Sequence, residues 1–157
     1  MTMLSEVTLS ILHGQVLVHL AAHPSPGLLW ADEHVAQGFA WSEGVVAFGV
    51  SDHDGECLLR VVEADDARPS DVALWAMQVP FDVAGPLMVG TVGLMHRVDV
   101  PLGAHALVFE ALPGDADHAL TLELRFARDD GTPFAILRRG GELETDALLR
   151  TDAELAG

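Results

Sequence analysis

The sequence predicts an all-β protein, an antiparallel β-sandwich of jelly-roll type with one short helix. Three observations predict this fold class. Apolar and polar residues alternate with a period of two, which is typical of strands that have one buried face. About nine short apolar runs recur at regular spacing, separated by acidic loops or loops with Gly and Pro. Helical periodicity occurs in one place, early in the chain.

The first two predicted strands lie on either side of a glycine. Residues 6–12 alternate apolar with polar side chains and predict a strand with one buried face. After Gly14 the alternation changes parity and continues to Leu20, which favours a bulge or a tight turn at this glycine. Two prolines within residues 23–27 then predict a loop.

The predicted helix lies between residues 30 and 41 and has about two turns. Asp32 is expected to cap it or to sit in its first turn, and Gly38 is expected to end it. Val35 and Phe39 are four residues apart, so we expect them on one face of the helix.

The later part of the chain predicts seven further strands. Asp54-Gly55 and Asp130-Gly131 are typical of hairpin turns between strands. Residues 140–157 form an acidic tail, for which the sequence leaves open a short surface helix or a frayed end. The predicted strands are Val45–Val50, Cys57–Val62, Val72–Val79, Leu94–Val100, Ala106–Leu112, Leu120–Ala127 and Phe134–Leu137.

Length and charge limit the function. The chain has 157 residues, half of them apolar, so we expect a single domain over residues 1–157. Its 24 acidic and 8 basic residues give a net charge of −16. Because binding to phosphate backbones or anionic lipids needs basic surfaces, nucleic acid and membranes are excluded as partners, and a basic protein is favoured. No signal peptide or membrane span is evident, so a cytoplasmic protein is expected.

The sequence holds no pattern that is typical of an enzyme or a metal site. The single cysteine, Cys57, lies in an apolar run and is expected to be a buried side chain. None of the eight histidines forms a His-x-His pair, and no Gly-x-Ser-x-Gly motif occurs. Gly90-Thr91-Val92-Gly93 lacks the lysine of a phosphate-binding loop. We therefore expect no catalytic activity, no metal and no cofactor.

The acidic residues gather in the predicted loops and on outward strand positions. Two interpretations stay open: a surface that keeps the protein soluble, or an acidic face that captures a basic partner and raises the association rate. Composition does not choose between them. The clusters are Asp52, Asp54, Glu56; Glu63, Asp65, Asp66, Asp71; Asp115, Asp117; and Asp129, Asp130.

Several segments resemble a known family. They are Val7–Ile11 with His13-Gly14-Gln15, Trp30–Ala40, Gly44–Phe48, Val79-Pro80-Phe81 and Val98–Gly103. Together, over residues 7–113, they are similar to the competence protein J family, whose members are inhibitor partners of DNA-entry nucleases. The most specific block is Trp-x-Asp-Glu…Gly-aromatic…Gly-x-x-x-Phe, from Trp30 to Phe48. The chain departs from the pattern at His105, where an aromatic residue, often Tyr, is expected.

The resemblance implies a small non-catalytic protein that binds and inhibits a nuclease, serving either DNA uptake or immunity to a toxin. The charge agrees, since a nuclease needs a positive cleft that a polyanion can occupy. The alternative is a jelly roll that binds a small ligand or catalyses a reaction with His and acidic residues inside the sandwich. Convergence of two or more of His13, His19 and His105 with an acid in a concave pocket would favour that alternative. A homo-oligomeric structural module also stays open.

Candidate partner-binding residues come from the acidic loops, because loop acids on a rigid sheet lose little entropy on docking. The first candidates are Asp52, Asp54, Glu56, Asp65 and Asp66. Asp32 and Glu33 are the second, since they are also expected to support the start of the helix.

Overall fold

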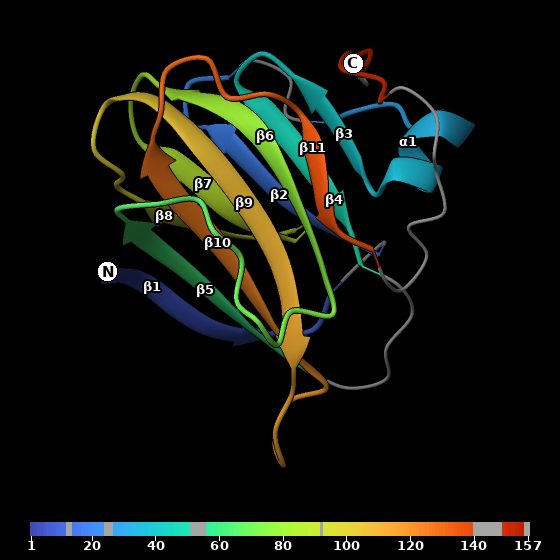
Figure 1. Cartoon of the computed structure of the whole chain (residues 1–157), viewed down its shortest axis with the longest axis vertical. Coiled ribbons are helices and arrows are strands. Elements are labelled where there is room, and N and C mark those ends of the chain that lie inside the picture. The colour runs from blue at the N-terminus through green and yellow to red at the C-terminus, as the bar shows by residue number, and fades with distance from the viewer. Residues whose placement is uncertain (12–13, 24–26, 51–55, 92, 140–148, 156–157) are drawn as a thin grey trace.

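The computed structural model describes residues 1–11, 14–23, 27–50, 56–91, 93–139 and 149–155, and forms two β-sheets that face each other (Figure 1). Sheet A has six strands in the order β1-β5-β10-β9-β6-β11, and sheet B has five in the order β3-β4-β2-β7-β8. The strands of sheet A are β1 (Thr2–Leu9), β5 (Cys57–Ala64), β6 (Trp75–Val83), β9 (Gly103–Pro113), β10 (Leu120–Arg128) and β11 (Ala135–Arg138). Those of sheet B are β2 (Gln15–Leu20), β3 (Phe39–Ser42), β4 (Val45–Gly49), β7 (Leu87–Thr91) and β8 (Leu94–Val98).

The all-β prediction is confirmed, with one exception to its antiparallel pairing. β10 pairs with β9 in antiparallel fashion, but it pairs with β5 in parallel. The chain leaves β5 for β6 and β9 before it returns to fill the place beside β5. Apolar and polar residues alternate in the same way in parallel and antiparallel strands, so the sequence pattern does not reveal the parallel pair.

The core lies between the two sheets and consists of alternate side chains from each. Leu122, Leu124 and Phe126 of β10 are fully buried and belong to it. Phe48 of sheet B stacks on Phe109 of sheet A, with ring centroids 4.7 Å apart and planes within 6°. This alternation is what the period of two predicted for a sandwich.

The helix is shorter than predicted. It runs from Asp32 to Gln37, and Gly38 ends it in the left-handed conformation at φ 85°. The residues expected to continue it form β3, which pairs with β4. The predicted pairing of Val35 with Phe39 on one helix face is therefore wrong: Val35 is 56% exposed, and Phe39 is a buried strand residue. Strand pairing and core burial outweigh the weak helical pattern here.

Both predicted hairpin turns are wrong. Asp54-Gly55 lies outside the described residues, but the strands that flank it belong to different sheets. Gly131 follows β10, which pairs with β5 and β9 and not with β11. The two-residue connection of β3 and β4 contains Gly44 at φ 80° instead. Turn residues allow a reversal, but they do not select which strands pair afterwards.

Strand boundaries differ from the predictions at several places. The sequence pattern does not predict β7, because Gly85-Pro86 stands directly before it and Gly90 interrupts its short apolar run. β1 starts four residues earlier than expected, and β6 starts at Trp75 rather than Val72, which is exposed. Cys57 is buried as predicted, and burial raises the pKa of its thiol.

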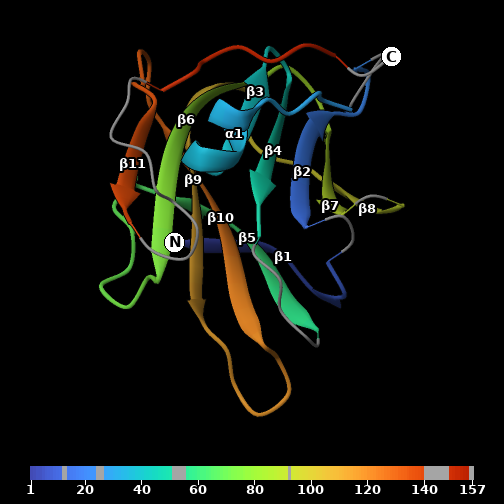
Figure 2. The same ribbon diagram turned by 90° about the vertical axis from the view of Figure 1, so that its right-hand side faces the viewer.

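The C-terminal segment, residues 149–155, packs along α1 (Figure 2). Gln37 donates through Nε2 to the Arg150 carbonyl oxygen and accepts from the Arg150 amide, both at 2.8 Å. His34 accepts from the Ala31 amide at Nδ1, so its Nε2 carries the proton and donates to the Asp152 carbonyl oxygen at 2.8 Å. These polar contacts explain why His34 and Gln37, and not Val35, form the buried face of α1.

Residues 140–148 and 156–157 of the predicted acidic tail lie outside the described residues, and residues 149–155 contain no helix. In the described part of the chain, no helix has the length and apolar character needed to cross a bilayer.

Candidate docking surface

The first group of predicted partner-binding acids does not form one cluster. Asp52 and Asp54 lie outside the described residues. Glu56 is exposed directly before β5, whereas Asp65 and Asp66 are exposed directly after it. An eight-residue strand spans roughly 26 Å. Glu56 and the Asp65-Asp66 pair therefore lie at opposite ends of sheet A.

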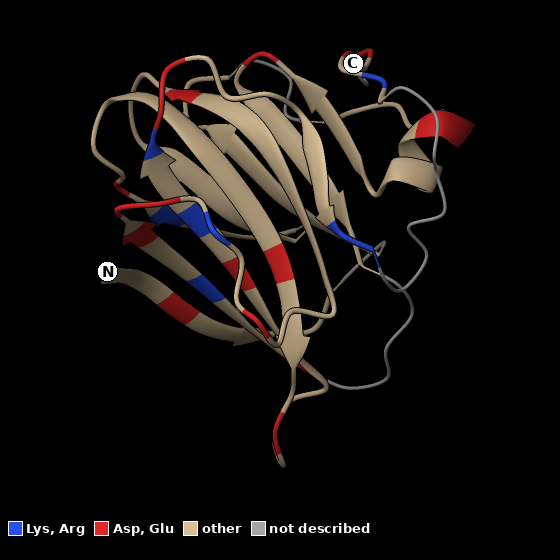
Figure 3. Cartoon of the chain, viewed as in Figure 1, with Lys and Arg blue, Asp and Glu red and all other residues tan. Residues whose placement is uncertain are grey.

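The second group of candidate acids lies on α1, away from both ends of β5. Asp32 and Glu33 are exposed in the first turn of α1, beside β3 (Figure 3). The N-cap residue of the helix is Ala31, which has no side-chain cap, so Asp32 is a first-turn residue and not the cap. Glu33 Oε2 lies 3.9 Å from Arg150 Nη1, an exposed pair that contributes little to stability.

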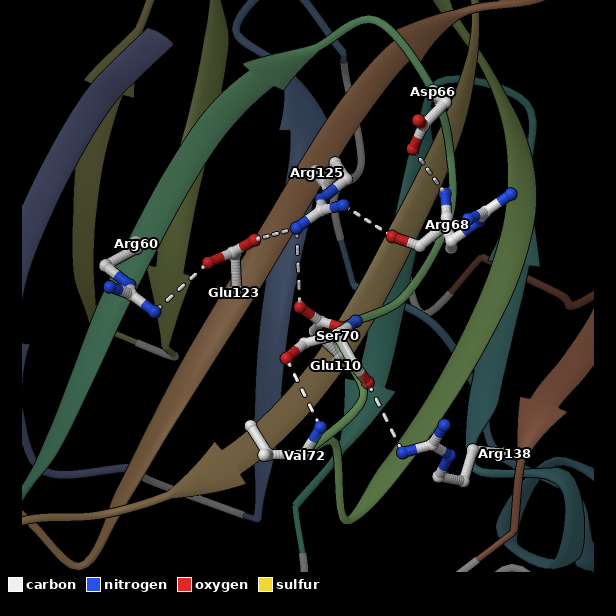
Figure 4. A network of polar contacts seen from close by, with 9 residues as sticks. All are labelled: Arg60, Asp66, Arg68, Ser70, Val72, Glu110, Glu123, Arg125 and Arg138. Atoms are coloured by element: carbon white, nitrogen blue, oxygen red, sulfur yellow. Dashed lines mark hydrogen bonds and ion pairs between the residues drawn. The ribbon is translucent and has the colours of Figure 1, made fainter. Parts of the chain in front are cut away.

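Two further acids are structural. Glu110 and Glu123 are buried on the outer face of sheet A and belong to a network with two arginines (Figure 4). Glu123 lies 3.2 Å from Arg60 and 3.0 Å from Arg125, and Arg125 lies 3.8 Å from Glu110. Burial is the main cause that raises the pKa of Glu110.

The network holds residues 65–74 against the outer face of sheet A. Glu110 Oε2 accepts from the Ser70 amide at 2.7 Å, and Arg125 donates to the Arg68 carbonyl oxygen. Arg138 donates to the carbonyl oxygen of Asp71 at 2.7 Å. Asp66 has a local role in this segment, because its Oδ1 accepts from the Arg68 amide at 3.0 Å.

A different set of acids does come together, around a cavity of about 370 Å³ at one end of the sandwich. The cavity is lined by the β3–β4 turn, the end of β6, the start of β9 and the segment after β10. Its volume falls in the range of small-ligand sites, about 300–1,000 Å³. The acids that line it are Glu43, Asp82, Asp129 and Asp130.

Two ring side chains are held in place in this cavity. Trp41 Nε1 donates to the Pro80 carbonyl oxygen at 2.9 Å and so connects sheet B to sheet A. His105 is 1% exposed, lies edge-on to Phe126 at 5.9 Å, and donates from Nδ1 to the Gly103 carbonyl oxygen at 2.8 Å. Since a carbonyl oxygen only accepts, the neutral ring carries its proton on Nδ1 and its lone pair on Nε2.

The condition for the enzymatic alternative is not met among the described residues. His105 lines the cavity, but His19 lies on the opposite face of β2 from the core residues Val16 and Val18. His13 lies outside the described residues. Within the described ranges, no group of three or more His, Cys, Asp and Glu residues is arranged to hold a metal ion.

The sequence does not predict this cavity, although it singles out three of the residues that line it. Asp129 and Asp130 were recognised as an acidic cluster, and His105 as a departure from a family pattern. Glu43 and Asp82 carried no sequence signal beyond their positions in a turn and on an outward strand position.

Comparisons with known proteins give one family and two structures. The family model described as Competence protein J (ComJ) matches residues 8–127. The crystal structure of ComJ from Bacillus subtilis, titled as an inhibitor of the DNA-degrading activity of NucA, is 21% identical and has a TM-score of 0.66. The match covers 80% of the present chain and 96% of the B. subtilis ComJ chain. A second structure, described as crocagin biosynthetic gene J, is 16% identical and has a TM-score of 0.49. This match covers 80% of the present chain and 97% of the other chain. No curated protein matches.

Proposed function

The chain belongs to the competence protein J (ComJ) family, and on this premise we propose that it is a non-catalytic protein that binds a nuclease and inhibits it. The observation that carries the proposal is the match of the family model over residues 8–127, most of the chain. The B. subtilis relative shares the fold and is described as an inhibitor of the DNA-degrading activity of NucA.

Charge supports a basic partner surface. The chain has a net charge of −16, and a nuclease must present positive charge to hold the phosphates of DNA. Several of its few cations are engaged inside the fold: Arg60 and Arg125 with buried carboxylates, and Arg138 with backbone oxygens. The field at the surface is therefore dominated by acids, which accelerates the encounter with a basic protein.

Capture from native cells tests the proposal. The tagged chain is used as bait in a lysate, and the eluate is assayed for degradation of plasmid DNA after the complex is dissociated. We expect a DNA-degrading enzyme to be retained and its activity to fall stoichiometrically as the purified chain is added back. Its identity distinguishes a DNA-uptake nuclease from a toxin. An unrelated bait of similar pI that retains the same enzyme, or a captured nuclease that the chain does not inhibit, would refute the proposal.

The acidic loops before and after β5 are our proposal for the steering charges. Reversing Asp52, Asp54 and Asp65 to lysine together is expected to slow association with the captured nuclease by about ten-fold or more, because steering is lost. Association of the unmodified chain should also slow as ionic strength rises toward about 0.5 M, where screening shortens to a few ångströms. Stopped-flow association and thermal unfolding measure both effects, and no change in thermal stability is expected.

Three exposed acids elsewhere provide the control for net charge. Reversal of Asp99, Asp152 and Glu154 changes the total charge equally and is expected to slow association less. Equal rates for the two triple variants, with no dependence on salt, would show that the loops next to β5 are only a solvated surface.

A further inference from the structure

The cavity at the end of the sandwich presents hydrogen-bond acceptors and negative charge to whatever enters it. We propose that it receives the guanidinium group of an arginine side chain of the partner nuclease; this inference rests on the proposed function. The observations that carry it are the unused acceptor of a buried histidine, the unpaired carboxylates at the rim, and the apolar wall between them.

His105 forms the buried end of the cavity. Its Nδ1–H is committed to the Gly103 carbonyl oxygen, and its Nε2 has no hydrogen-bond partner among the described residues. The side chain is 1% exposed, yet Nε2 is not one of the fully enclosed polar atoms without a partner, so this nitrogen is open to the cavity. A ligand that brings an N–H group into the cavity can therefore donate a hydrogen bond to this nitrogen.

The rim is acidic and lacks cations of its own. Glu43, Asp82 and Asp130 are exposed and make no ion pair or side-chain hydrogen bond among the described residues. Asp129 accepts from Thr132 Oγ1 at 2.9 Å through Oδ2. Arg128 is next in sequence, but its Nη2 donates to the Leu102 carbonyl oxygen and it does not line the cavity. The carboxylates are therefore free to pair with a cation from outside.

The shape and chemistry of the wall favour arginine over lysine. Trp41, Pro80 and Phe81 also line the cavity, and their apolar surface suits the aliphatic part of an arginine side chain. An indole is also the aromatic group that attracts cations best. The carboxylates come from three separate segments and the imidazole acceptor from a fourth. A planar guanidinium with five N–H donors reaches several of them at once, whereas an ammonium is more strongly hydrated.

The first test uses a small probe in place of the nuclease. N-acetyl-arginine methylamide is titrated into the full chain at millimolar concentration, and the ¹⁵N resonance of His105 Nε2 is followed by NMR. We expect this resonance and the amides of Gly44, Ala104 and Gly131 to shift with saturation. The citrulline analogue, which has the same shape without the charge, should produce no such shift. An equal response to citrulline would overturn the proposal.

Paired variants link the response to the rim. Asp82→Asn with Asp130→Asn is expected to weaken binding of the arginine probe by about five- to ten-fold, from the loss of two charge pairs. The matched control is Asp71→Asn with Asp117→Asn, which changes the net charge equally at exposed sites outside the cavity and should leave binding within about two-fold. Both pairs are exposed, so unchanged thermal unfolding verifies that they fold. Equal weakening by the two pairs contradicts the proposal.

The captured nuclease gives the second test and separates this inference from the proposed function. The Asp82→Asn, Asp130→Asn variant should dissociate from the nuclease about five- to ten-fold faster than the control pair. If it binds and inhibits as well as the unmodified chain, the cavity is not the site and the inhibitor function stands. If the unmodified chain captures no nuclease, the proposed function fails, and the probe titration still reports on the cavity by itself.

Discussion

Replacing Arg125 by alanine is expected to lower the free energy of unfolding by about 3–5 kcal/mol, the cost of leaving a buried charge without its partner. Glu110 and Glu123 are 0% and 3% exposed, and Arg125 contacts both. The same substitution also removes the hydrogen bond to the Arg68 carbonyl oxygen and loosens residues 65–74. Urea denaturation at pH 7 measures the loss.

Arg97 provides the matched control. It pairs with Asp99 at 3.3 Å, but both side chains are mostly exposed, so Arg97→Ala is expected to cost less than about 1 kcal/mol. A loss for the Arg125 variant no larger than that of the Arg97 variant would show that the buried network is not needed for stability.

The dependence on pH gives a second check of the same network. Burial raises the pKa of Glu110 above its unfolded value, so its contribution to stability is fully present below the unfolded pKa and is lost as pH rises through the folded pKa. Without Arg125, the charged form of Glu110 is disfavoured further. The deficit of the Arg125→Ala variant should therefore shrink as the pH falls from 7 toward about 4, near the ordinary pKa of glutamate. A deficit that is independent of pH would contradict this cause.

Truncation of Phe109 is expected to cost about 3–5 kcal/mol, as for other buried phenylalanines. Its ring is fully buried and stacks on Phe48 across the two sheets, so alanine leaves a cavity in the middle of the sandwich. Phe109→Leu refills most of that volume and should cost less than about 1.5 kcal/mol. Chemical denaturation of the three proteins measures the series.

A double-mutant cycle isolates the stacking contact. Single and double alanine substitutions of Phe48 and Phe109 are expected to show a coupling free energy of about 0.5–1.5 kcal/mol. Additive losses would mean that the two rings contribute only by burial, and that their face-to-face contact does not tie the sheets together.

The strands could be predicted from the sequence because each depends on its own alternation. β10 is predicted almost in full and β9 from Ala106 to Leu112, since their core residues recur at every second position. β3 was mistaken for helix because four residues are too few to show a period, and only its pairing with β4 makes it a strand. The parallel neighbour of β10 depends on how distant segments meet, which no local pattern encodes.

The candidate site also combines features that the sequence predicts with features that only the packing decides. Net charge and the match to the competence protein J family follow from the sequence, and they carry the choice of a basic nuclease as partner. Which acids become neighbours follows from the packing. The loop acids on either side of β5 are close in sequence, yet the extended strand separates Glu56 from Asp65. Glu43, Asp82 and Asp130 are far apart in sequence and line one cavity.

The sequence by itself determined the fold class, most of the strands, the sign of the charge and the family, because these depend on local periodicity, composition or the spacing of residues within short segments. The tertiary structure alone decided that Glu110 and Glu123 are buried and bound to arginines while other carboxylates stay free. It also decided that His105 ends up beneath an acidic rim. The physical reason is that the burial of a carboxylate and its electrostatic partners depend on which residues surround it in three dimensions. The sequence around a carboxylate does not show whether its neighbour in the fold is an arginine or water.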